Sequence, residues 1–271
     1  MDKYQYKLLM ELAAYGDTQA MAELTEFLCM QKDSDLFPEQ KAMVFDYLLK
    51  LADDENPRAM LQLGVIFYNG TMGQEQNYTE ARKWYERAAN GGDDWAQCNL
   101  GYFYYYGREV EVDYEIAYDY FTKSAYQNNP NALYKLGDLH YHGKYVKQDF
   151  DAAFYWYERA RSFAIDYNGQ GGSNVSEVFP NICHRLGLCY LNGRGIEVDL
   201  LQALNLFQIA ERNFYFWTMR EHPFAAATLR ETQRQLRIVR RKLNTTIPRD
   251  KLAYRNDKII PLFIDESSHL I

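Results

Sequence analysis

The sequence lacks an apolar segment long enough to cross a membrane. A transmembrane helix needs about 18 or more consecutive apolar residues, and no such run occurs in the 271 residues. The first ten residues mix charges with their apolar side chains, so they do not form the apolar core of a signal peptide. These absences predict a cytoplasmic protein that does not engage a membrane.

Cysteine is scarce, and the cysteines present show no pairing pattern. The four are Cys29, Cys98, Cys183 and Cys189. A disulfide framework is not expected in a chain of this size and compartment. Neither a C-x-x-C pair nor an H-E-x-x-H motif occurs, and Cys183 and Cys189 would lie about 120° apart around one helix. We therefore predict no metal site and no cofactor.

Motifs of catalysis are also missing. No serine stands in the G-x-S-x-G turn of an activated nucleophile. The glycines of residues 167–174 lack the G-x-G-x-x-G spacing of a phosphate-binding loop. Asp113, Asp149 and Asp199 recur at one position of a repeating pattern, which favours helix capping over acid–base chemistry. These observations predict a protein with no catalytic residues and no enzymatic activity.

What the sequence does contain is one pattern in four copies. The first copy reads Ala-Met-Leu-Gln-Leu-Gly-Val-Ile-Phe-Tyr-Asn-Gly over residues 59–70, and the others begin at Ala96, Ala132 and Ile182. Each is followed by a second signature, which in the first copy is Ala-Arg-Lys-Trp-Tyr-Glu-Arg-Ala over residues 81–88. A fixed period of this size is typical of stacked helical hairpins, each of which buries its apolar face against its neighbours.

The repeat predicts its own helix boundaries. Gly70, Gly107, Gly143 and Gly193 follow the last apolar turn of the first helix and suit the left-handed residue that ends it. Asn77, Asp113, Asp149 and Asp199 precede the second helix and suit its N-cap. We also expect Gly64 and its equivalents to let two helix backbones approach closely, because glycine has no side chain.

These residues resemble the Sel1-like repeat, a relative of the tetratricopeptide repeat. The family pattern reads A-x-x-x-L-G-x-x-Y-x-x-G and then A-x-x-W-Y-x-x-A-A, and the match covers about residues 58–211. Phe67 and His140 depart from it, since both replace the tyrosine. The resemblance implies an all-α fold, a right-handed α-solenoid superhelix of helix-turn-helix repeats with helical caps. It further implies an adaptor, an assembly scaffold or a signalling regulator.

The chain divides into four predicted parts. Residues 1–57 form a capping helix and a degenerate opening repeat, in which Thr25 replaces the glycine. Residues 58–211 form four repeats, with a 14-residue insertion within 162–181. Residues 212–247 form a basic capping helix, whose apolar stripe is expected to cover the last repeat. Residues 248–271 form an irregular tail containing the apolar run 259–264, which either docks back or finds a partner.

The functional prediction rests on the first helix of each repeat, which has a second stripe of residues displaced from the buried apolar stripe. By resemblance to tetratricopeptide arrays, it lines a concave groove that binds a protein or peptide. Tyrosine and tryptophan are frequent in binding hot spots because they offer large area at low entropy cost. The alternative is that these rings simply pack between repeats. The groove residues predicted are Arg58, Leu61, Tyr68, Asn69, Trp95, Tyr102, Tyr105, Tyr106, Tyr134, Asp138, Tyr141, His142 and His184.

Charge is unevenly distributed along the chain. The net charge is −7, yet residues 223–244 hold six basic residues against the single acidic residue Glu231. The acidic remainder predicts a partner with basic residues. Nucleic acid is not predicted, because no aromatic residue interleaves the arginines and the sequence pI is about 5.3. A contact between this basic helix and the acidic repeats is an equal alternative.

Two other functions stay open at this point. The first is an inhibitor or immunity-type protein that blocks a toxin or an enzyme with tight one-to-one affinity. The second is a small-ligand-binding protein or an enzyme that uses the insertion near residues 167–176. The oligomeric state is left open as well.

Overall fold

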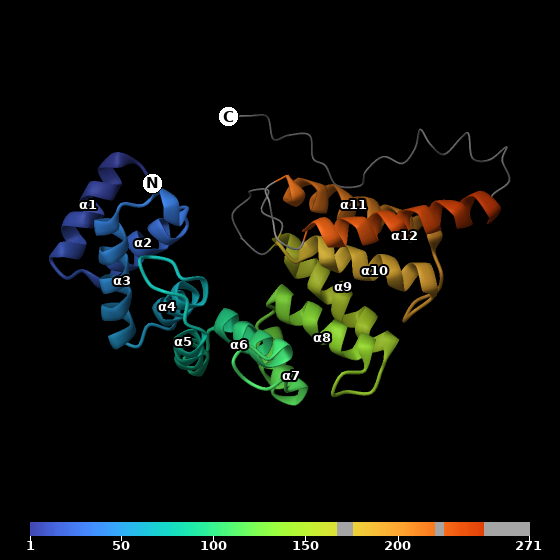
Figure 1. Cartoon of the computed structure of the whole chain (residues 1–271), viewed down its shortest axis with the longest axis horizontal. Coiled ribbons are helices and arrows are strands. Elements are labelled where there is room, and N and C mark those ends of the chain that lie inside the picture. The colour runs from blue at the N-terminus through green and yellow to red at the C-terminus, as the bar shows by residue number, and fades with distance from the viewer. Residues whose placement is uncertain (167–175, 220–224, 247–271) are drawn as a thin grey trace. The chain divides into compact units, whose positions relative to one another are not determined.

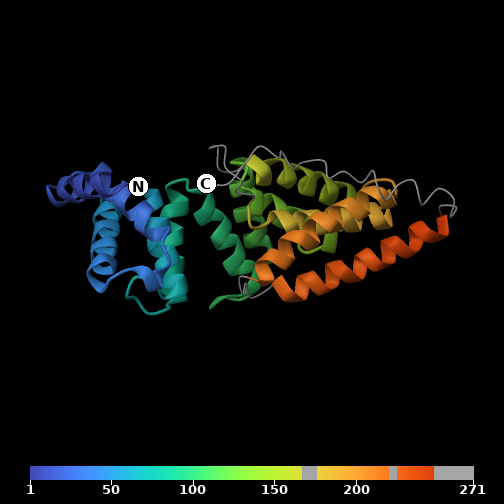
Figure 2. The same cartoon turned by 90° about the horizontal axis from the view of Figure 1, so that it is seen from above.

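The computed structural model describes residues 1–166, 176–219 and 225–246, and within them the chain is helical throughout, with no strand. Figure 1 shows the helices in chain order, and Figure 2 shows them from above. A short 3₁₀ helix, η1, covers Asp33–Asp35. The α-helices are α1 (Lys3–Ala14), α2 (Thr18–Cys29), α3 (Pro38–Asp53), α4 (Pro57–Asn69), α5 (Tyr78–Asn90), α6 (Asp94–Tyr106), α7 (Tyr114–Tyr126), α8 (Pro130–His142), α9 (Phe150–Asp166), α10 (Phe179–Asn192), α11 (Leu200–Thr218) and α12 (Ala225–Thr246).

The chain folds as two compact units, Met1–Val178 and Phe179–Ile271. The first contains α1 to α9, and the described part of the second contains α10 to α12. Extensive contacts join α4 with α5, α6 with α7, α8 with α9 and α10 with α11, and each of these pairs is one predicted repeat. Helix α12 contacts α11 to a similar extent. Most of the insertion (167–175), the tail 248–271 and its apolar run 259–264 lie outside the described residues.

The predicted helix ends are confirmed. Gly70, Gly107, Gly143 and Gly193 all have positive φ, between 65° and 67°, the left-handed conformation that glycine adopts without steric cost. The predicted N-caps accept hydrogen bonds from the first turn of the second helix. Examples are the Asp113 carboxylate, which accepts from Ile116 N at 3.0 Å, and the Asp149 carboxylate, which accepts from Ala152 N at 2.9 Å.

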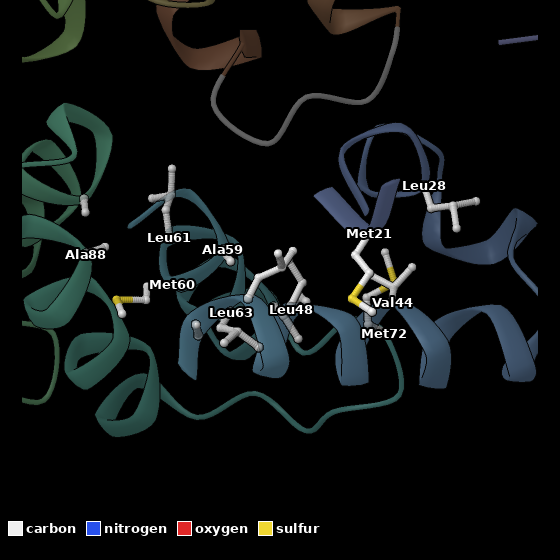
Figure 3. Packing of buried hydrophobic residues seen from close by; sticks show 14 of the residues in the cluster. Met21, Leu28, Val44, Leu48, Ala59, Met60, Leu61, Leu63, Met72 and Ala88 are labelled. Atoms are coloured by element: carbon white, nitrogen blue, oxygen red, sulfur yellow. The ribbon is translucent and has the colours of Figure 1, made fainter. Parts of the chain in front are cut away.

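A continuous apolar core joins the opening segment to the first repeats. It draws residues from α2, α3 and α4, including Met21, Val44, Leu48 and Leu63, and Figure 3 shows this cluster from close by. Thr25, which replaces the repeat glycine, is buried in it, and its hydroxyl donates to the Ala22 carbonyl oxygen at 2.9 Å. The opening segment therefore shares its core with the first repeats.

The repeat glycines serve a different purpose from the one expected. A Cβ atom on Gly64 would lie 2.4 Å from a ring carbon of Tyr85, and one on Gly101 would lie 2.6 Å from ring carbons of Phe121. Gly137 and Gly187 meet rings of the second helix in the same way. The expectation that two backbones meet there is therefore wrong in its detail, because an aromatic side chain of the second signature fills the space.

Helix α12 buries one face within the second unit. Leu236, Val239 and Leu243 are buried with Leu204 and Phe207 of α11. Within the described residues, no helix is both long enough and apolar enough to cross a membrane.

Candidate functional site

A buried lysine stands among four tyrosines where α6 and α8 meet. Lys135 on α8 is only 6% exposed. Its Nζ lies 4.8 Å from the ring centroid of Tyr105, 5.2 Å from that of Tyr106, and 5.3 Å from those of Tyr102 and Tyr134. A cation within about 6 Å of a ring centroid is attracted by the negative face of the ring. We name Lys135 and these four tyrosines the tyrosine cluster.

Helical spacing explains why the rings gather. Tyr102, Tyr105 and Tyr106 stand at i, i+3 and i+4 on α6, so their side chains share one side of the helix. Tyr102 and Tyr106 stack in parallel with centroids 6.0 Å apart, while Tyr105 and Tyr106 meet edge to face at 4.9 Å. The Lys135 ammonium also donates a hydrogen bond to the Tyr106 hydroxyl at 2.9 Å. The cluster is therefore held by both ring contacts and a polar bond.

Asp138 balances the buried charge. One carboxylate oxygen lies 3.8 Å from Lys135 Nζ, and the other accepts a hydrogen bond from the Tyr157 hydroxyl at 2.8 Å. Burial acts to lower the pKa of Lys135, but Tyr102 and Asp138 act in the opposite direction, and the net result is a pKa above the ordinary lysine value. Burial likewise raises the pKa of Tyr102 well above its ordinary value. At neutral pH the cluster thus contains the Lys135 ammonium ion beside an uncharged Tyr102.

Two further cations lie over neighbouring tyrosines. Lys144, in the loop after α8, donates hydrogen bonds to the hydroxyls of Tyr105 at 3.2 Å and Tyr114 at 3.1 Å, and its Nζ lies 4.5 Å from both ring centroids. The guanidinium of Arg108 lies 4.9 Å from the ring centroid of Tyr68. Cationic side chains of the second and third repeats therefore lie over tyrosine rings, although the chain as a whole is acidic.

The structure brings together only part of the predicted groove set. Tyr102, Tyr105, Tyr106, Tyr134 and Asp138 converge on Lys135. The remaining members lie elsewhere and differ in burial. Arg58, Asn69 and His142 are exposed, Tyr68 and Trp95 are half-buried, and Leu61, Tyr141 and His184 are buried.

Several of those remaining members contact residues outside the tyrosine cluster, as Arg58, Leu61 and His184 do. Arg58 lies 3.5 Å from a carboxylate oxygen of Glu26. Leu61 belongs to the apolar core of the first unit. His184 belongs to the second unit, where its Nδ1 lies 2.9 Å from the hydroxyl of Thr232 on α12.

Sequence reasoning missed Lys135 and Lys144. The predicted groove residues included Tyr134 and Asp138 but not Lys135, which lies between them in the sequence and contacts both. The available signal was the spacing of Lys135 and Asp138, which stand at i and i+3, the separation at which opposite charges meet on a helix. A lysine is seldom fully buried, so the repeat pattern alone did not suggest it.

The cysteines are unreactive by position. Cys98, Cys183 and Cys189 are buried, and none of the four cysteines forms a disulfide. Burial raises the pKa of Cys29 to about 11, and burial also raises the pKa of Cys98. Among residues 1–166, 176–219 and 225–246, no group of three or more His, Cys, Asp or Glu side chains could hold a metal ion.

Comparison with protein families identifies the repeat. The family model described as the Sel1 repeat matches residues 57–93, 96–129, 130–162 and 182–213, about half of the chain. The four matched segments correspond to the helix pairs α4–α5, α6–α7, α8–α9 and α10–α11.

Individual relatives are more distant. The chain is 28% identical over 123 residues to the chitin synthase regulator SKT5 of Saccharomyces cerevisiae, which is 45% of this chain and 17% of that protein. A Sel1 repeat protein from Oxalobacter formigenes has a TM-score of 0.46 at 25% identity, covering 77% of this chain and 55% of that one. A protective antigen of uropathogenic Escherichia coli with the SLR fold has a TM-score of 0.51 at 24% identity, covering 93% of this chain and 59% of that one. The latter likeness shows the fold, an all-α solenoid of stacked helix pairs.

Proposed function

Because this chain belongs to the Sel1 repeat family, whose repeats generally mediate contacts between proteins, we propose that it is a non-catalytic module that binds another protein. We place the binding surface at the tyrosine cluster. The proposed role is that of an adaptor, a scaffold or a regulator, and the partner segment would lie in a groove lined by these rings.

The observation that carries this proposal is the ordering of the rings around Lys135. A surface whose side chains are already fixed loses less conformational entropy when a partner arrives. The rings of the cluster are fixed by one buried ammonium ion, by stacking, and by the 2.9 Å bond from Lys135 to Tyr106. Tyr106 nonetheless exposes 53% of its surface and Tyr102 is half-buried. The cluster is thus preorganised, and Tyr106 is its exposed member.

The local charges refine the expected partner. The net charge of −7 suggested a partner with basic residues, and such residues would be attracted by the acidic surfaces elsewhere. At the cluster, however, Lys135 and Lys144 already occupy tyrosine faces. A segment that brings carbonyl or carboxylate acceptors to the hydroxyl of Tyr106, an exposed residue, fits this surface better than a cation does.

A regulatory role against an enzyme is the second candidate. The curated relative is a regulator of chitin synthase by name, and an inhibitor or immunity-type protein would also act by binding one target tightly. The chain spans only 17% of that relative, so a regulatory function is proposed here rather than transferred. The third candidate, a small-ligand or enzyme site at the insertion, depends on residues 167–175, which lie outside the described part of the chain.

The proposal is tested by placing a photoreactive amino acid at Tyr106 in the full chain and identifying what it cross-links in cells of the native organism. Tyr126 on α7 provides the matched control, because it is 80% exposed and stands outside the cluster. We expect one protein to cross-link at stoichiometric yield from position 106 and not from position 126.

Substitution supplies the quantitative check. Tyr106→Ala should weaken binding of the identified partner about tenfold or more, since truncation of a hot-spot tyrosine costs about 2 kcal/mol. Tyr126→Ala should leave it unchanged. Equal cross-linking from both positions, or unaltered affinity of Tyr106→Ala, would refute the cluster as the binding surface. Tyr102 and Tyr134 are less suitable for truncation because they are packed within the cluster.

A further inference from the structure

Helix α1 carries an apolar face that no described residue covers. Tyr4, Leu8, Leu12 and Tyr15 stand at i, i+4, i+8 and i+11, so at about 100° per residue they fall within roughly 80° of one another. They are 84%, 49%, 39% and 92% exposed. A contiguous run of exposed large apolar side chains on one element marks a contact with another molecule.

This face is separate from the one that holds α1 in the fold. Leu9 and Ala13 are buried in the core of the first unit. On the same side, the Tyr6 ring lies 6.3 Å from that of Phe27, and its hydroxyl accepts a hydrogen bond from the Gln40 side chain at 3.3 Å. The exposed stripe lies about 130° around the helix from these residues. The helix therefore has two apolar faces, of which its own fold uses one.

The charges beside the exposed stripe identify its occupant. Lys7 and Glu11 lie on one flank of the stripe, with Nζ and Oε1 3.8 Å apart and both side chains largely exposed. When two identical helices pack antiparallel about a two-fold axis, a flank of one helix meets the same flank of the other copy. Each residue then lies opposite the residue of the second copy for which the two residue numbers add to a constant. The stripe from Tyr4 to Tyr15 is centred between residues 9 and 10. An axis at residue 9 sets Lys7 against Glu11 of the second copy and Glu11 against its Lys7.

We propose that α1 is a self-association surface, on which a second copy of this chain packs its own α1 antiparallel. The two apolar stripes cover each other, and two Lys7–Glu11 pairs border them on one side. A parallel pair would instead bring this charged flank against the opposite flank, which offers Gln5 and no charge. The stripe is thus self-complementary in the antiparallel arrangement alone.

The dimer is expected to be weak. One helix face from each copy buries less than the roughly 1,600 Å² of a standard interface, so we expect dissociation constants in the micromolar range. This inference does not depend on the tyrosine cluster. A dimer would carry two copies of that cluster, and two linked sites raise the apparent affinity for a repeated partner.

Sedimentation velocity of the full chain over a wide concentration range tests the proposal. We expect a monomer–dimer equilibrium, which Leu8→Glu should weaken about tenfold or more because it places a carboxylate in an apolar contact. The matched control is Leu201→Glu on α11, where the leucine is similarly exposed at 44%, and it should have no effect.

Charge reversal tests the antiparallel register. Lys7→Glu and Glu11→Lys should each weaken the dimer roughly threefold, because each sets like charges opposite one another twice. The double variant should restore it, since the pairs are re-formed with exchanged signs. A monomer at all concentrations, or a dimer untouched by Leu8→Glu, would overturn the proposal. A double variant that stays weak would overturn the antiparallel arrangement.

Discussion

At the scale of single residues, the repeats depend on a glycine matched to an aromatic ring. Each repeat glycine lies in the interior of a first helix, where glycine is about 1 kcal/mol less favourable than alanine. A ring of the second helix lies over it in every repeat, as Tyr85 lies over Gly64 and Tyr157 over Gly137. Full burial of such a side chain contributes about 1.5–3 kcal/mol. The ring contact therefore outweighs the helix propensity that the glycine loses.

Gly101→Ala should consequently destabilise the protein, although alanine is the better helix former. The new methyl group would lie 2.6 Å from two carbons of the Phe121 ring, and overpacking of this kind costs about 1–3 kcal/mol. Chemical denaturation measures the effect as a change in the free energy of unfolding. The Gly101→Ala/Phe121→Leu double variant should lose less stability than the two single variants added together, because the smaller side chain makes room for the methyl group. Simple additivity would contradict the ring contact.

At the scale of elements, one carboxylate joins segments that the repeat pattern does not relate. Asp33 of η1 accepts a hydrogen bond from Lys41 Nζ of α3 at 2.6 Å. Its other oxygen accepts one from the backbone N–H of Met72, in the loop after α4, at 2.8 Å. The bond from Lys41 and then that from Met72 lower the pKa of Asp33 below its ordinary value. The opening segment is thereby linked to the loop of the first repeat.

This link predicts a dependence of stability on pH. Because the pKa of Asp33 is lower in the folded than in the unfolded chain, its carboxylate stabilises the fold above the ordinary aspartate value of about 3.9. That stabilisation is lost as the pH falls through the lowered pKa. Asp33→Asn should therefore reduce the thermal unfolding temperature by a few degrees at pH 7, and the difference from wild type should shrink below about pH 4.

Thermal unfolding followed by circular dichroism at both pH values checks this prediction. Asp35→Asn provides the control, since Asp35 is exposed in the same short helix and, among the described residues, its carboxylate accepts only from the Ser34 hydroxyl. A difference between Asp33→Asn and wild type that stayed constant across pH would show that the carboxylate charge is not involved.

At the scale of the whole molecule, stability should be distributed along the array. Helices in both units contact chiefly their neighbours in sequence, and in such arrays stability is close to a sum of local terms. Helix α12 ends the described series, with Leu236 buried against α11 and Arg237 exposed beside it. A destabilising substitution in α12 should therefore lower the stability of the neighbouring helices and not that of distant ones.

Leu236→Ala should destabilise the second unit and leave the opening helices intact. Truncation of a buried leucine costs about 2–5 kcal/mol, whereas Arg237→Ala at the adjacent exposed position should stay within about 0.5 kcal/mol. Hydrogen exchange measured by mass spectrometry should show lost protection in α10 to α12 only for Leu236→Ala, with α2 to α5 unchanged. Equal loss in α2 to α5 would show that the array unfolds as a single cooperative unit.

Much of the fold was predictable because it depends on local pattern. The capping residues Asp113 and Gly107 do what their types and spacing predict, since a helix end needs only its own neighbours. The gathering of Tyr102, Tyr105 and Tyr106 on one side of α6 follows from helical spacing as well. The cation at their centre did not follow, because Lys135 comes from another helix and its burial depends on how α6 and α8 meet.

The sequence alone thus determined the repeat, its paired helices, their caps and the apolar stripe of each helix. Periodicity states which residues share a face, and this information is complete within one element. Only the tertiary structure decided what each side chain meets: a ring over Gly64, an ammonium ion among four tyrosines, a backbone N–H at Asp33, and a partly exposed Leu8. The physical reason is that burial and charge pairing are properties of neighbours in space, which a pattern along the chain does not specify.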